Sequence, residues 1–449
     1  MMLLAIDWSV VAVKAGQFVL SFSILILLHE LGHFLPAKWF KCRVEKFYLF
    51  FNPWFSLFKK KKGETEYGIG WIPLGGYVKI SGMIDESMDK EQMKLPAEPW
   101  EFRSKPAWQR LIIMLGGVTV NIILAIIIFI FILWIWGKEY LPPENAKYGI
   151  ATYSLAKSVG LQDGDVVLKV DTVELKDIFR LRPEIVLNEA KSLTVRRGDS
   201  VFTLPVSDQL IQALNSRDAK GFVGVRYPFV ASSFSKHSNA EAAGMKTGDM
   251  IIGVNGKTTA FFNEFREAVK DLKDTTIRLT LLRNYDTLSL SVKLNEEGTM
   301  GVYSKPIDSL GFRFETREYN FFQAVPAGFR ECWSTLSNYL TGLKQLFTGK
   351  AKASESLGSV ISIGGIFPGV WNWQAFWTLT AVFSVILAFM NVLPIPALDG
   401  GHALFTLIEM ITGRKPSDKF MEYAQMVGMV LLLGLMAYAM GLDIWRIFK

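Results

Sequence analysis

The feature that most constrains this sequence is a stretch of 26 residues, Leu111 to Trp136, that contains no charged side chain. About 20 apolar residues are enough to cross the hydrocarbon core of a bilayer as a helix, so this stretch predicts a membrane span. Trp134 and Trp136 at its end are typical of the membrane–water interface. Three further apolar stretches predict three more spans, at about 10–35, 376–393 and 426–442.

The charge pattern supports a membrane protein rather than a nucleic-acid-binding protein. The chain is 50% hydrophobic and carries a formal net charge of +7, and its densest basic run, Lys59 to Lys62, follows the first span. Such a run is either a topology signal on the cytoplasmic side or a solvated turn. We therefore expect the lipid bilayer as the surroundings and no nucleic-acid partner. The positive-inside rule places the loops after spans one and three in the cytoplasm and the region of about 140–320 on the outer face.

An internal repeat occupies this middle region. Residues 160–171 and 244–256 each give a glycine turn, a Gly-Asp turn and an apolar strand, about 84 residues apart. An amphipathic helical stretch follows each copy, for example at 262–272. The repeat resembles tandem PDZ domains, expected at 141–226 and 227–315, although the first copy has Asp171-Thr172 where a glycine normally completes the turn. The alternative is two small β-rich modules without a ligand.

An HExxH motif stands near the end of the first span. His29 and His33 are four residues apart, so a helix projects both imidazoles from one face, where they could bind one Zn²⁺ with Glu30 beside the open coordination position. On a soluble helix the same pattern could be a solvated polar face. Ionisable residues at the end of an apolar stretch are costly in a membrane, which favours a functional site.

Catalytic zinc usually has three protein ligands, so a third ligand must come from elsewhere in the chain. Asp399 is the best candidate, because two prolines and two glycines around it break the third span at 391–401. Irregular backbone at membrane depth is tolerated where it lines a wet cavity, as an active site would. Alternatively, Asp399 caps a helix, and His402 could bind the metal in its place.

These two motifs resemble those of a known family. HExxH in the first span and NxxPxPxLDG at 391–400 are the paired signatures of the site-2 protease family of intramembrane zinc metalloproteases. The four spans with two PDZ domains are similar to its bacterial branch of regulators of sigma-E protease, the RseP-like branch. The resemblance implies a multi-pass α-helical membrane protein with four transmembrane helices, an inserted pair of α/β PDZ domains and a membrane-associated β-hairpin region near 67–79. The membrane part is then formed by 1–140 and by 316–449, which begins with an amphipathic segment.

The resemblance also implies the roles of individual residues. His29, His33 and Asp399 become the zinc ligands, Glu30 the general base, and Asn391 a residue that holds the substrate. A substrate must present an extended backbone, because a transmembrane helix hides its carbonyl groups in its own hydrogen bonds. A strand at 69–72, with Ile69, Gly70 and Trp71, or one at 77–80 could offer an edge for strand addition.

The implied function is regulated intramembrane proteolysis in the bacterial inner membrane, with the HExxH motif near the cytoplasmic side. The implied partners are single-span membrane proteins, namely a trimmed anti-sigma factor and remnant signal peptides. Two other classes of function are compatible with parts of the pattern. An intramembrane metal transporter would use the His and Asp residues but gives Glu30 no role. A PDZ scaffold without proteolysis leaves the HExxH motif and Asp399 unexplained.

Overall fold

The computed structural model describes residues 7–73, 75–83, 96–216, 221–352, 354 and 358–448. The chain divides into two compact units. The first combines residues 1–137, 318–343 and 357–449, and the second combines 138–317 and 344–356. In the sequence, the second unit therefore interrupts the first twice.

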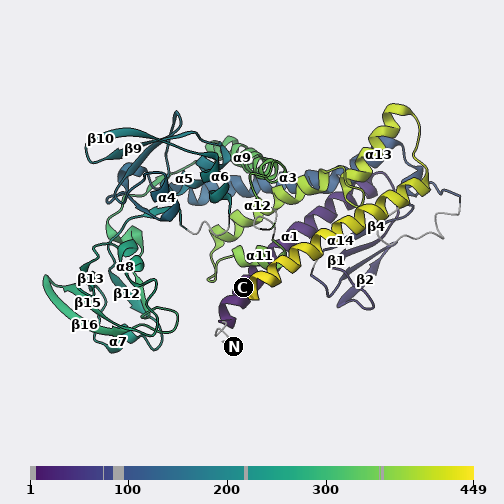
Figure 1. Ribbon diagram of the computed structural model, residues 1–449. Helices are drawn as coiled ribbons and strands as arrows, with labels where there is room; N and C mark the ends of the chain where they lie inside the picture. Colours follow the sequence, from purple (N-terminus) through teal and green to yellow (C-terminus); the bar gives the residue numbers. More distant parts are fainter. Residues whose placement is uncertain are drawn as a thin grey trace. The chain divides into compact units, whose positions relative to one another are not determined.

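Long helices dominate the first unit (Figure 1). Among the described residues, four helices are long and apolar enough to cross a membrane, and they coincide with the four predicted spans. These four are α1 (Trp8–Trp39), α3 (Ala107–Trp136), α12 (Trp373–Val392) and α14 (Asp418–Phe448). The other helices are α11 (Val360–Ile366), α13 (Asp399–Thr412), the short η1 (Phe102–Ser104) and α9 (Phe321–Phe347), whose end from residue 344 belongs to the second unit.

Buried side chains on one face of α1, most of them polar, pack against α3 and α12. They follow α1 at every fourth residue, the spacing that places side chains on one helix face, and they are Gln17, Ser21, Leu25, His29 and His33. The hydroxyl oxygens of Ser21 and Thr380 lie 2.8 Å apart, and Ser384 donates to the carbonyl oxygen of Asn121 at 2.7 Å. Hydrogen bonds between polar side chains of this kind contribute to the association of membrane helices.

Glycines bring α1 and α3 into backbone contact beside the histidines. A Cβ atom on Gly32 would collide with the carbonyl group of Gly116, and one on Gly116 would collide with that of Gly32. A Cβ atom on Gly117 would lie 2.5 Å from both His29 Cε1 and His33 Nε2. Small residues permit such a close approach between membrane helices. Gly116 therefore lets the two backbones touch, and Gly117 leaves room for the imidazoles.

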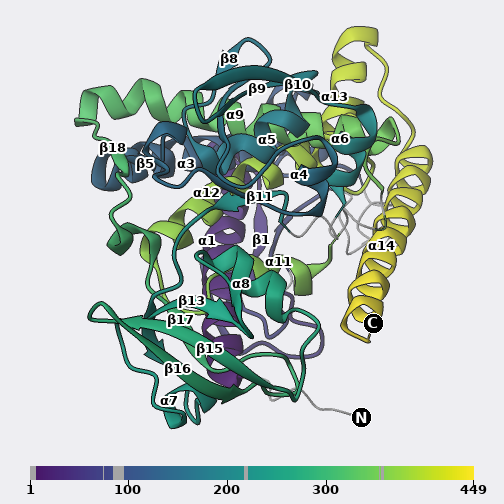
Figure 2. The ribbon, with the colours of Figure 1, turned by 60° about the vertical axis from the view of Figure 1, so that its left-hand side comes forward.

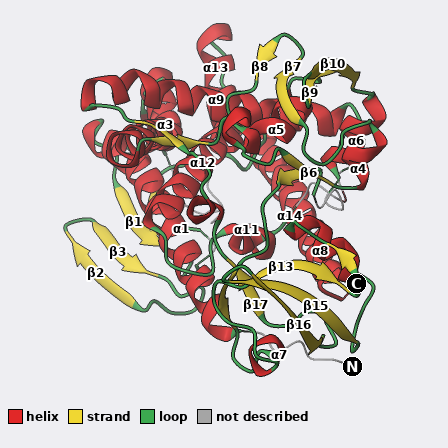
Figure 3. Cartoon of the chain, turned by 90° about the vertical axis from the view of Figure 1, so that its left-hand side faces the viewer, coloured by secondary structure: helices red, strands yellow, loops and turns green. Residues whose placement is uncertain are grey.

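The segment between α1 and α3 forms a four-stranded sheet rather than a hairpin alone (Figure 3). Its strand order is β2-β3-β1-β4, with β1 and β3 parallel and the other pairs antiparallel. The lysine run lies in β2, an exposed edge strand and not a turn, where lysines discourage pairing with another chain. The strands are β1 (Val44–Leu49), β2 (Phe58–Lys62), β3 (Thr65–Ile69) and β4 (Tyr77–Ile80).

The expected edge at 69–72 is wrong. β3 lies between β2 and β1, so both of its sides are paired. Leu57 donates its N–H to the Ile69 carbonyl, and Gly70 donates to the Leu49 carbonyl. Glycine at position 70 serves close packing, because a Cβ atom there would collide with the Phe51 carbonyl. The alternative edge at 77–80 is present, since β4 has β1 as its only partner among the described strands.

The second unit contains two modules with the same strand order (Figure 2). The first sheet is ordered β10-β9-β7-β8 and the second β16-β15-β13-β14. The first module contains β6 (Ile150–Thr152), α4 (Ser154–Ser158), β7 (Val166–Val170), β8 (Val173–Glu174), α5 (Leu181–Leu187), β9 (Ser192–Arg197), β10 (Ser200–Pro205), α6 (Asp208–Asn215) and β11 (Val223–Val225). The second contains β12 (Ala231–Phe234), α7 (Asn239–Ala242), β13 (Met250–Val254), β14 (Lys257–Thr258), α8 (Phe262–Val269), β15 (Thr276–Arg283), β16 (Asp286–Lys293) and β17 (Val302–Ser304). β5 (Lys138–Tyr140) pairs with β18 (Glu315–Arg317), and the remaining short helices are η2 (Pro143–Asn145), η3 (Ile178–Arg180) and η4 (Ile307–Leu310).

Both modules contain the same ion pair, which supports a common fold for the two. Arg197 binds the buried carboxylate of Asp165 at 2.7 Å in the first, and Arg283 binds that of Asp249 at 2.7 Å in the second. Hydrogen bonds from Arg283 hold the pKa of the Asp249 carboxyl below its usual range. Each aspartate follows the glycine of its Gly-Asp turn, so the sequence repeat coincides with a structural repeat.

Candidate metal centre

The two histidines of the HExxH motif lie on the inner face of α1. His29 and His33 are both buried, and their Nε2 atoms are 3.3 Å apart. The helix continues through the motif to Trp39, which keeps the one-turn spacing that the sequence predicts. Both imidazoles therefore present Nε2 to the same point.

The break after α12 brings Asp399 to that point. α12 ends at Val392 and α13 begins at Asp399, as the prolines and glycines of this segment predict. The intervening loop folds against the first turn of α13, where Cβ atoms on Gly400 and Gly401 would collide with the carbonyl groups of Leu393 and Ile395. Glycine is thus required at both positions for Asp399 to face α1.

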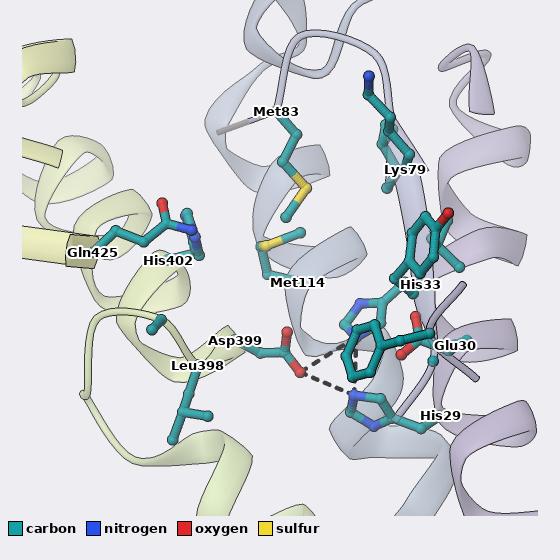
Figure 4. Close-up of a pocket in the computed structure, with 16 residues that line it drawn as sticks. His29, Glu30, His33, Lys79, Met83, Met114, Leu398, Asp399, His402 and Gln425 are labelled. Carbon is teal, nitrogen blue, oxygen red and sulfur yellow. Dashed lines mark hydrogen bonds and ion pairs between the residues drawn. The ribbon is translucent and has the colours of Figure 1, made fainter. Parts of the chain in front are cut away.

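Three potential ligand atoms converge there (Figure 4). Asp399 Oδ2 lies 3.3 Å from His29 Nε2 and 3.3 Å from His33 Nε2, so the three atoms form a nearly equilateral triangle. A tetrahedral zinc ion with bonds of about 2.0–2.1 Å separates its ligand atoms by about 3.3–3.4 Å. Asp399 Oδ2 is buried and accepts no hydrogen bond from the described residues. The donor set and its spacing therefore fit zinc.

The second ring nitrogen of each histidine has its own partner on α3. His33 Nδ1 lies 2.8 Å from the Ile113 carbonyl oxygen, which can only accept, so Nδ1 carries the proton and Nε2 is free to bind a metal. His29 Nδ1 lies 3.2 Å from the side-chain amide of Asn121, which is fully buried. Nδ2 of Asn121 is the atom that faces Nδ1, and a half-turn of the amide would place Oδ1 there, which gives His29 the same tautomer as His33. Such partners orient metal-binding histidines.

A cavity of about 350 Å³ opens beside the triangle. Its lining includes Glu30, the strand β4 with the preceding Gly76, His402 and Gln425. A Cβ atom on Gly76 would lie 2.7 Å from Ile26 Cγ2 of α1, so glycine lets the start of β4 approach the helix at Glu30. Tyr77 also lines the cavity, and burial raises the pKa of its hydroxyl to about 12, so it stays protonated and donates to Asn52. The cavity thus joins a carboxylate, a potential metal site and a strand edge.

The other predicted site residues are divided between this cavity and its surroundings. The Asn391 amide lies 3.3 Å from His29 Nε2, beside the triangle. Ile69, Gly70 and Trp71 are not among the described residues that line the cavity. His402 lines the cavity but is outside the triangle.

The motifs of the sequence predict no role for two polar residues that the structure places at the site. Asn121 lies next to His29, and Gln425 lies in the cavity wall. Each is a polar residue within an apolar span, and that placement is the signal that could have identified them.

Comparisons with known proteins agree with this geometry. The profile of peptidase family M50 matches residues 17–435. The regulator of sigma-E protease RseP of Salmonella typhimurium is 29% identical over 470 residues, which cover 99% of this chain and 100% of that protein. Its namesake in Escherichia coli is 28% identical over 456 residues, which cover 96% and 98%. A Xylella fastidiosa protein whose name assigns it to the zinc metalloproteases is 29% identical over 442 residues, which cover 94% and 96%. With helices suited to cross a membrane and a family profile that matches most of its length, the chain belongs to peptidase family M50, the site-2 protease family of zinc metalloproteases.

Proposed function

We propose that this protease carries out regulated intramembrane proteolysis of single-span membrane proteins, with a trimmed anti-sigma factor and remnant signal peptides as its substrates. The observation that carries the proposal is the ligand triangle on helices that are apolar enough to span a membrane. The two RseP proteins that are similar over nearly their whole length support the substrate class, since their name refers to the regulation of sigma-E.

In this proposal His29, His33 and Asp399 hold the zinc ion. A zinc ion held by these residues would supply Lewis-acid chemistry, polarising the scissile carbonyl and lowering the pKa of a water molecule toward about 7. Glu30 is the general base, which accepts the proton of the attacking water and returns it to the leaving amine. Asn121 and the Ile113 carbonyl orient the two imidazoles. Asn391, next to His29, donates its amide N–H to the substrate backbone.

The modules of the second unit are proposed to be PDZ domains on the outer side of the inner membrane. Their shared strand order and their paired Arg–Asp contacts support one ancestral module, as tandem PDZ domains require. The basic residues after the first and third spans support a cytoplasmic position for those loops. With the spans alternating, the inserted unit then belongs to the opposite side.

A purified preparation tests this function directly. We expect the protein, reconstituted in lipid vesicles, to cut a single-span substrate with a short outer stub inside its apolar segment, as located by mass spectrometry of the products. The same substrate with the Glu30→Gln protein is the control for a contaminating protease. Cuts that fall only outside the apolar segment would contradict the proposal.

The substrate strand is proposed to add to the edge of β4. Ser81 donates its N–H to the Arg43 carbonyl on the side of β1, and the direction of backbone groups alternates along a strand. Val78 therefore turns its N–H and C=O groups away from β1, at the open edge that lines the cavity. Pairing at this edge would hold a substrate extended and expose its carbonyl groups to the metal.

Proline at position 78 removes the outward N–H group without removing a bond to β1. We expect Val78→Pro to reduce cleavage of a substrate with a stable helix by about tenfold or more, and of one with helix-breaking residues by less. Val78→Ala is the matched control, because it removes side-chain contacts but keeps the N–H group. Equal rates for the two variants on both substrates would show that β4 does not pair with the substrate.

A further inference from the structure

Gln425 is a buried amide in the cavity wall, and the proposed mechanism gives it no role. It lies on α14, and only 5% of its surface is exposed, whereas Val427, Val430 and Leu431 on other faces of the same helix are more than half exposed. Its Oε1 atom is buried and accepts no hydrogen bond from the described residues. Burying an amide oxygen without a partner is unfavourable, so a partner other than the described residues is expected.

The position of Gln425 in the cavity is fixed by the loop that precedes Asp399. Gly428 lies one helical turn further along α14, and a Cβ atom there would collide with the carbonyl oxygen of Pro396. Glycine thus allows α14 to touch the loop backbone, and Gln425, three residues earlier, lies on the same helix face. Figure 4 shows Gln425 and His402 across the cavity from Lys79 and Glu30. An amide and a strand edge therefore lie on opposite sides of one cavity.

An extended substrate has N–H and C=O groups that require hydrogen-bond partners along both of its edges. Successive residues of a strand turn their N–H and C=O groups to alternate sides, so pairing with β4 satisfies only every second residue. At membrane depth the other groups are costly unless the protein supplies partners. A glutamine side chain carries one acceptor oxygen and a donor NH₂ group, which together can satisfy the N–H and the C=O of one residue.

We propose that Gln425 is a substrate-binding residue that pairs with the backbone of the substrate at the edge that faces away from β4. This inference rests on the proposed proteolysis, and it adds a second contact to the substrate backbone beside the one with β4. Because the contact is made to the backbone, it accepts many side chains and requires only that the substrate be extended. Gln425 thereby favours unwound segments over helices, whose backbone groups are already paired.

Synthetic substrates test the contact at the level of single atoms. A series of single-span peptides, each with one backbone N–H replaced by an ester oxygen near the cleavage site, is cleaved by the wild type and by Gln425→Met. Methionine keeps the length of the side chain and removes its polar atoms. Gln17→Met is the matched control, because Gln17 is also a buried glutamine in a span with an unpartnered Oε1, but it does not line the cavity.

We expect Gln425→Met to keep its zinc and to lower kcat/KM for the unmodified peptide by about 5- to 30-fold, mainly through KM, as the loss of one or two hydrogen bonds predicts. One ester position should slow the wild type and the Gln17→Met variant but not Gln425→Met. If Gln425→Met loses zinc, Gln425→Asn, which keeps an amide at a shorter reach, replaces it in the same comparison.

Two results would overturn the inference: an unchanged KM in Gln425→Met, or equal sensitivity of the variant and the wild type to every ester. Failure of the proposed function itself looks different, because the wild type would then leave the unmodified peptide intact or cut it outside the apolar segment.

Discussion

Replacing Glu30 with glutamine is expected to lower the cleavage rate by about 10²–10⁴-fold, the usual contribution of a general base. Glutamine has nearly the same shape but cannot accept the proton of the attacking water. Since His29, His33 and Asp399 are untouched, the variant should bind as much zinc as the wild type. The measurements are single-turnover cleavage of a single-span substrate and the zinc content of the purified variant.

Glu30→Asp serves as the control for the carboxylate itself, because it retains an acceptor but withdraws it by one methylene. We expect its activity to lie between that of the wild type and that of Glu30→Gln. Full proteolysis by Glu30→Gln at normal zinc content would rule out Glu30 as the base.

Removal of the Asp399 carboxylate should affect the metal as well as the rate. We expect Asp399→Asn to weaken zinc binding by more than the roughly 10–100-fold that is typical for the loss of a residue that merely orients a ligand. Activity should fall in parallel, because Oδ2 forms one corner of the triangle with the two Nε2 atoms. Zinc affinity is measured by competition with a chromophoric chelator.

His402→Ala is the matched control, since His402 lines the same cavity but lies outside the triangle. It should keep the zinc affinity of the wild type. The assignment of the third ligand would be refuted by the reverse pattern, in which His402→Ala loses zinc and Asp399→Asn keeps it.

The parts of the fold that depend on local sequence could be predicted. Each span follows from an apolar stretch long enough for the bilayer, because in hydrocarbon a helix is the only single segment that pairs all of its own backbone groups. The one-turn spacing of His29 and His33 follows from helix geometry. The break before Asp399 follows from its prolines and glycines, which a continuous helix does not tolerate well.

The parts that depend on pairing between distant segments could not be predicted. The strand near Ile69 was expected at an edge, but its parallel partner β1 and its antiparallel partner β2 enclose it. Nothing in the local sequence of a strand identifies its neighbours when its residues suit either an edge or a centre. The contact between Asn121 and His29 joins residues 92 positions apart, and no spacing rule within one helix foresees it.

We infer that catalysis by this protease depends on one zinc ion in the site of α1 and α13. The most direct test is to remove zinc from the purified wild type with a chelator, and then to restore it while cleavage of a single-span substrate is followed. We expect close to one zinc ion per chain before chelation, no cleavage in its absence, and recovery of cleavage in proportion to the zinc that returns. Cleavage that continues at full rate after the zinc has been removed would contradict the account.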